Sequence, residues 1–182
     1  MHDDAALAEA NRDRMGATDC ERLRSGPVAQ PVNTFTSLGY VAGAAVVLSR
    51  ARRADPDGHL NAVVYSTFMA LVGAGSVAFH GPQPPGAKLM HDLPIPALLG
   101  VGLGTPLMRR LRGADPAPGW TARRGAALVG TTLAGVACYA AGRTDAPTCD
   151  PESPVQFHGL WHLVSAAAFV VGGDILFGGV DG

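Results

Sequence analysis

Long apolar stretches alternate with short polar clusters along this chain. Five stretches rich in Ala, Gly, Val and Leu run approximately over residues 33–49, 61–80, 91–109, 123–142 and 156–178. A helix needs about 20 apolar residues to cross a hydrocarbon core of roughly 30 Å. The pattern therefore predicts an all-α fold, a polytopic transmembrane helical bundle of about five spans.

The polar beginning of the chain differs from the rest. Residues 1–30 contain no comparable apolar run, whereas residues 31–182 hold all five stretches. We therefore expect a polar N-terminal segment, 1–30, followed by one transmembrane helical domain, 31–182. Only 16% of the residues are charged and 24 of 182 are glycines, which let membrane helices approach closely. A soluble bundle with unusually apolar helices is the alternative.

Basic residues indicate an orientation in the membrane, because Lys and Arg concentrate in short loops on the cytoplasmic side. Two arginine clusters flank the predicted spans, namely Arg50, Arg52 and Arg53, then Arg109, Arg110, Arg112, Arg123 and Arg124. The two loops are two crossings apart, so both can face the cytoplasm. This predicts a multi-pass protein of the cell membrane with an extracytoplasmic N-terminus. The net charge of −1 gives no argument for a nucleic-acid partner.

Two of the three cysteines share one side of the predicted topology. Cys20 and Cys149 fall on the extracytoplasmic side, while Cys138 lies inside the fourth stretch. Such a compartment permits disulfides, and a Cys20–Cys149 bridge would tie the N-terminal segment to the last loop. The alternative is two free thiols on the same side.

Three histidines lie where apolar stretches begin or end. The second stretch ends in GAGSVAFH, which places Ser76 and His80 on one helix face, and HGLWH in the last stretch repeats this spacing with His158 and His162. Catalytic zinc is typically held by three protein ligands with one open position, and converging ionisable groups inside spans indicate function. The histidines therefore predict a zinc site, although each one alone is also compatible with an interfacial cap.

An acidic residue accompanies the histidines at the same membrane boundary. Asp92 opens the third stretch in the sequence HDLP. Its carboxylate is placed to orient or deprotonate a water molecule on the metal, so we expect it to take part in catalysis.

These motifs follow one another in a definite order. DCER, QPVNTFTSL, GAGSVAFH, HDLP and HGLWH occur between about residues 19 and 178. The order resembles the alkaline ceramidase family, which belongs to a wider superfamily of zinc membrane hydrolases and receptors with adiponectin-receptor-like and GPI-remodelling proteins. The resemblance implies a zinc ion held by three histidines with a serine and an aspartate beside it, matching His80, His158, His162, Ser76 and Asp92.

The same resemblance has further implications and one departure. It matches Cys20 and Cys149 to the family's cysteine pair. It also implies a calcium site in the N-terminal segment, where Glu21 matches one ligand and Asp19 is a candidate for another, although Leu23 and Gln30 stand where an amide and a carboxylate are expected. The family has seven spans, so this chain would be a shortened version with a differently walled lipid pocket.

Taken together, these features predict a zinc-dependent membrane hydrolase that cleaves the amide bond of a ceramide-like N-acyl lipid. Zinc would lower the pKa of a water ligand, Asp92 would act as general base and then acid, and Ser76 would donate a hydrogen bond to the oxyanion. A lipid ester hydrolase would use the same residues, and a receptor or scaffold would use zinc only to staple helices. The expected partners are the bilayer and a lipid substrate; no protein partner is implied.

Overall fold

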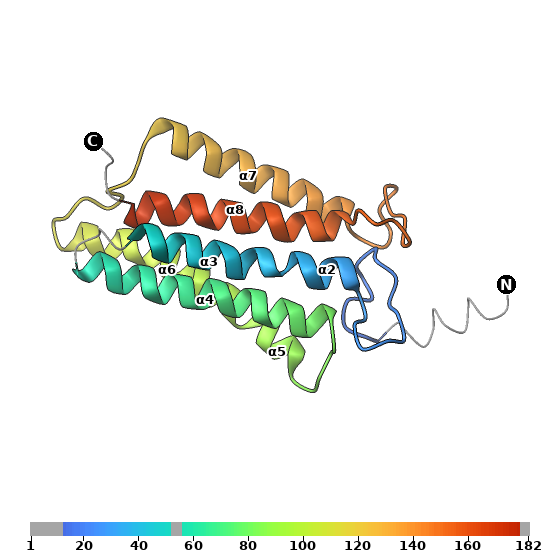
Figure 1. Ribbon diagram of the computed structural model, residues 1–182. Coiled ribbons are helices and arrows are strands. Elements are labelled where there is room, and N and C mark those ends of the chain that lie inside the picture. The colour runs from blue at the N-terminus through green and yellow to red at the C-terminus, as the bar shows by residue number, and fades with distance from the viewer. Residues whose placement is uncertain (1–12, 52–55, 179–182) are drawn as a thin grey trace, which may run out of the picture.

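Helices make up the regular structure of the protein, which is described here for residues 13–51 and 56–178 of a computed structural model (Figure 1). They are α2 (Pro31–Thr36), α3 (Leu38–Arg50), α4 (Pro56–His80), α5 (Ala87–Asp92), α6 (Pro94–Leu111), α7 (Ala122–Ala141) and α8 (Phe157–Phe177). The described ranges contain no strand, only an isolated β-bridge between Asp19 and Arg143. The predicted all-α bundle is confirmed. Residues 1–12 of the predicted polar segment, Arg52 and Arg53 lie outside the described residues.

Three helical segments are long and apolar enough to cross a membrane. They are Pro31–Arg50, in which α2 and α3 follow each other with a break at Ser37, Pro56–His80, and Phe157–Phe177. The third and fourth predicted spans correspond to α6 and α7, which are long helices but are not among these three. The composition and length of the three segments are those of a membrane protein.

The long helices lie side by side. In Figure 1, α3 runs between α4 and α8, α7 packs along α8, and α6 accompanies α4. Aromatic and aliphatic side chains from these helices fill the space between them, and the largest include Tyr40, Tyr65, Met69, Leu98 and Phe177. This packing holds α4 and α8, which carry the candidate histidines, in fixed positions.

One end of the bundle collects segments that are far apart in the sequence. The disulfide between Cys20 and Cys149 is present, which confirms the predicted bridge. The N-terminal segment is also held by backbone hydrogen bonds, from Ala29 to the Gly81 carbonyl and from Gln30 to the His80 carbonyl. The segment therefore covers the end at which α4 finishes and α8 begins.

Two close approaches at this end require glycine. A methyl group on Gly142, just after α7, would collide with the backbone of His158, and one on Gly75 in α4 would collide with the Met90 carbonyl of α5. Glycine at these positions lets α7 and α5 come close to the helices that carry the histidines.

Candidate metal centre

Three buried histidines converge at the covered end of the bundle. His80 is the last residue of α4, and His158 and His162 lie one turn apart in the first turns of α8. Their relative exposures are 0%, 6% and 2%. The ring centroids are 5.1 Å apart for His80–His158, 5.1 Å for His80–His162 and 4.8 Å for His158–His162. One nitrogen from each ring lies within 4.8 Å of the others, a spacing that could hold a metal ion.

A hydrogen-bond network fixes the tautomer of His80. The side-chain amide of Gln30 donates through Nε2 to the carbonyls of Gly16 and Glu21, at 3.0 and 2.8 Å, so its Oε1 must point the other way. That oxygen lies 2.8 Å from His80 Nδ1 and can only accept. Nδ1 therefore carries the proton, and the lone pair on Nε2 is buried without any hydrogen-bond partner. A buried lone pair in this position is what a metal ion would use.

His162 is oriented in the same way by two hydroxyl groups. The Thr36 and Ser37 hydroxyls donate to backbone carbonyls one turn earlier in α2, at 2.7 and 2.6 Å. Each hydroxyl has a single proton, so it accepts from His162 Nδ1, which lies 3.2 Å from both oxygens. Nε2 of His162 is then the nitrogen left with a lone pair. A neutral imidazole in this tautomer can bind a metal through Nε2.

His158 is next to a buried carboxylate. Asp19 Oδ1 lies 3.3 Å from His158 Nδ1, and Oδ2 lies 3.9 Å from His80 Nδ1. Arg143 contacts the same carboxylate at 2.9 Å. Burial raises the pKa of Asp19 to about 6, while the Arg143 guanidinium opposes this shift and the Glu21 carboxylate adds to it. Asp19 is therefore mainly ionised at neutral pH, and Arg143 balances its charge.

The other predicted catalytic residues lie at different depths. Ser76 is buried in α4, one turn before His80. Asp92, at the end of α5, is exposed, and its carboxylate accepts from Lys88 Nζ at 2.7 Å and from His91 Nδ1 at 2.8 Å. The His91 ring centroid is 6.1 Å from that of His80. Within the described ranges, the carboxylate within 4 Å of the clustered histidines is that of Asp19 and not that of Asp92.

The two candidate calcium ligands have separate partners. Asp19 faces the histidines and Arg143. The carboxylate of Glu21 accepts from the backbone N–H groups of Val32 and Asn33, both at 2.8 Å, and so caps the N-terminus of α2. Calcium binding by these residues stays a prediction.

The sequence interpretation missed the residues that orient the histidines. Gln30 was noted only as a departure from a calcium site, and Thr36, Ser37 and Arg143 were not singled out. A signal was present, because Gln30, Asn33 and Ser37 recur at helical spacing around the start of an apolar span, and all three are fully buried. A buried polar face in such a span indicates a site.

Comparison with known proteins gives no match: no family model, no curated protein and no solved structure is significantly similar to this chain.

Proposed function

We propose that the protein is a zinc-dependent membrane hydrolase that cleaves the amide bond of a ceramide-like N-acyl lipid. The observation that carries this proposal is the convergence of His80, His158 and His162, whose ligand nitrogens lie within 4.8 Å of one another in a buried site. Three protein ligands with a fourth position open to water are typical of catalytic zinc, whereas structural zinc is normally held by four.

The donor set is compatible with zinc, one of several metals that imidazole binds. His80 and His162 each have Nδ1 committed to a neighbouring acceptor, which leaves Nε2 for the ion. Partners of this kind raise ligand basicity and fix ring orientation, and their loss costs 10–100-fold in metal affinity or activity. Zinc bound there would supply Lewis acidity and a nucleophile derived from water near neutral pH.

The side chains around the histidines divide the remaining tasks. Ser76, one turn before His80, donates a hydrogen bond to the carbonyl oxygen of the substrate as negative charge develops on it. The pair of Asp92 and His91 takes up a proton and returns it to the leaving amine. Support for the pair comes from the 2.8 Å bond between His91 Nδ1 and Asp92 Oδ1 and from the proximity of the His91 and His80 rings.

The membrane context supports a lipid substrate. The histidines lie at the ends of α4 and α8, two of the segments that are apolar enough to cross a bilayer. A hydrophobic substrate therefore reaches the site from the bilayer. Basic residues are slightly more numerous at the opposite end of the bundle, where Arg50, Arg109, Arg110, Arg112, Arg123 and Arg124 lie, than at the histidine end, where Arg14, Arg22, Arg24, Lys88 and Arg143 lie. By the positive-inside rule the opposite end faces the cytoplasm of the cell and the histidine end faces outside.

The proposal is tested with purified protein and a panel of N-acyl and O-acyl lipids. Released fatty acid is measured by mass spectrometry, with and without zinc, for the wild type and for His158→Ala. Zinc-dependent release from N-acyl lipids, lost in the variant, is expected. Release from O-acyl lipids alone would indicate an esterase, and stoichiometric zinc without release from any lipid would indicate a receptor or scaffold in which zinc staples the helices.

A further inference from the structure

Asn33 in α2 is a buried polar residue that the proposed function does not use. Its exposed fraction is 0%, and neither its side-chain Nδ2 nor its Oδ1 has a hydrogen-bond partner in the part of the chain that the structure describes. Most buried polar groups in proteins are paired, because an unpaired one loses its hydration without compensation. The Asn33 carboxamide is therefore placed to bind something other than the protein itself.

The neighbours of Asn33 on α2 show that its side chain projects between α4 and α8. Thr34 lies beside the end of α4, because a methyl group on Gly81 would meet its Cγ2 at 3.3 Å. Thr36 lies beside α8, because a methyl group on Gly159 would meet its Oγ1 at 3.1 Å. Successive residues of a helix are rotated by about 100°, so Asn33 projects close to the middle of the angle between Thr34 and Thr36. This is the space in which the histidines of α4 and α8 converge.

Asn33 also lies at the level of the metal centre along the bundle. Gln30, one turn before it, accepts a hydrogen bond from His80 at 2.8 Å, and Ser37, one turn after it, accepts from His162 at 3.2 Å. The rings of these two histidines are 5.1 Å apart. The backbone carbonyl of Asn33 itself interacts with the His162 ring. Asn33 is therefore flanked on its own helix face by residues that orient two of the candidate metal ligands.

We propose that the Asn33 carboxamide belongs to the metal centre and holds a water molecule there. Three imidazole nitrogens leave one position of a tetrahedral zinc for water. A cation alone would satisfy only Oδ1, whereas water can donate to Oδ1 and accept from Nδ2, so that both unpaired atoms gain a partner. Full burial of Asn33 and His80 favours a partner as small as water. The inference rests on the zinc of the proposed function and not on hydrolysis.

The first test measures metal binding to the full chain in the absence of lipid substrates. Zinc affinity is determined by competition with a chelator, and the visible absorption of the cobalt-substituted protein reports the coordination of the metal. Asn33→Leu keeps the branching of the side chain and removes both polar atoms, so it is expected to lower zinc affinity by about 10–100-fold and to change the cobalt spectrum. Asn33→Asp keeps an oxygen and adds a charge that attracts the ion, so it is expected to bind zinc at least as tightly as the wild type.

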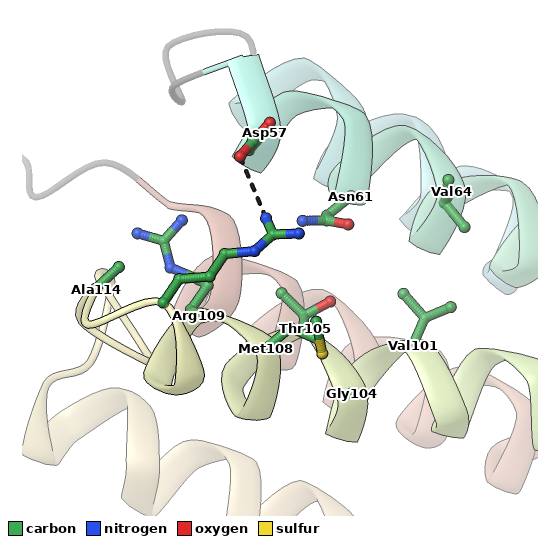
Figure 2. A pocket seen from close by; sticks show the side chains of 10 residues that line it. Asp57, Asn61, Val64, Val101, Gly104, Thr105, Met108, Arg109 and Ala114 are labelled. Carbon is green, nitrogen blue, oxygen red and sulfur yellow. Dashed lines mark hydrogen bonds and ion pairs between the residues drawn. The ribbon is translucent and has the colours of Figure 1, made fainter.

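Two variants in α4 serve as matched controls. Asn61→Leu makes the same substitution in the cavity between α4 and α6 at the other end of the bundle (Figure 2), about 28 Å from His80 at 1.5 Å per residue. Ser66→Ala removes another buried polar atom without a partner among the described residues, about 21 Å from His80. Both variants are expected to keep the zinc affinity and the cobalt spectrum of the wild type.

The second test separates this role from a purely structural one. Without metal, Asn33→Leu is expected to melt at or above the wild-type temperature, because it removes an unpaired buried amide. A lower melting temperature of the metal-free variant would show that Asn33 stabilises the fold and would overturn the inference. Wild-type zinc affinity in Asn33→Leu, or an equal loss in either control, would also overturn it and leave the zinc site itself intact. A wild type that binds no metal would overturn the proposed function as well.

Discussion

Gln30 and His80 form a buried hydrogen bond in which the amide oxygen lies 2.8 Å from the ring Nδ1. The two residues are 50 positions apart, and their bond joins the N-terminal segment to the end of α4. Gln30 itself is held in place by the carbonyls of Gly16 and Glu21. The orientation of a candidate metal ligand is thus set by a segment that lies outside the membrane-spanning helices.

Replacing Gln30 with leucine is expected to weaken zinc binding by about 10–100-fold, because His80 loses the acceptor that fixes its tautomer. Zinc affinity is measured by competition with a chelator. Gln156→Leu is the matched control, since the Gln156 amide is also buried but donates to the carbonyls of Asp150 and Ser153. An equal loss of affinity in both variants would show that the effect is general destabilisation.

Zinc content should depend on the three clustered histidines and not on the total number of histidines in the chain. We expect one zinc per chain in the wild type, and a loss of stoichiometric metal on changing His80, His158 or His162 to alanine. His59→Ala, near the opposite end of α4, is expected to keep its zinc. Elemental analysis of the purified proteins decides this, and full zinc content in all three cluster variants would contradict the site.

The fold and the histidine cluster were predictable because they depend on local patterns. Apolar length predicted the long helices, and the His158–His162 spacing placed two rings on one helix face. The side chains that orient the rings come from other parts of the chain. Asp19 and Arg143 meet only because the chain folds back over the bundle end, 124 positions apart. The pattern of apolar and polar residues within one segment does not predict such a contact.

Asp19 illustrates how one residue type supports two interpretations. An aspartate next to Cys20 and Glu21 fitted a calcium site, and its carboxylate is found beside His158, His80 and Arg143. Asp92 began a predicted span, and in the structure it ends the short helix α5 at an exposed position. Helix boundaries depend on tertiary contacts, such as the close packing of α5 on Gly75, which local sequence does not encode.

Breaking the Cys20–Cys149 disulfide should loosen the metal centre. Cys20 follows Asp19 directly, and the bridge closes a loop with a sequence separation of 129. In a chain-entropy model, a disulfide that closes a loop of this length stabilises the folded state by up to about 5 kcal/mol. Helices that remain inserted in the membrane when the protein unfolds reduce this value, because they already restrict the unfolded chain. Cys20→Ser/Cys149→Ser is expected to lower both the melting temperature and the zinc affinity. Cys138→Ser, which removes a free thiol, should change neither.

Changing Asp19 to asparagine separates the zinc and calcium interpretations. If its carboxylate serves the histidines, Asp19→Asn lowers zinc affinity by about 10–100-fold and added calcium does not alter the melting temperature of the wild type. A calcium site would instead give a wild-type melting temperature that rises with calcium and a variant that does not respond. Asp145→Asn, an exposed carboxylate in the loop after α7, is the control for lost charge.

The acid–base pair is expected to affect turnover without affecting metal content. Asp92→Asn and His91→Gln should each lower kcat by about 10²–10⁴-fold, the range for a lost general acid or base, while one zinc per chain remains. Glu152→Gln, which removes an exposed carboxylate paired with Arg22 at the same end of the protein, should retain wild-type kcat. Turnover is measured on the lipid that the substrate panel identifies. Loss of turnover with zinc still bound indicates a role in proton transfer, whereas Asp19→Asn is expected to lose turnover because it loses zinc. If Asp92→Asn keeps full turnover and Asp19→Asn loses turnover with zinc still bound, the proton acceptor is Asp19, the carboxylate that the fold places beside His158.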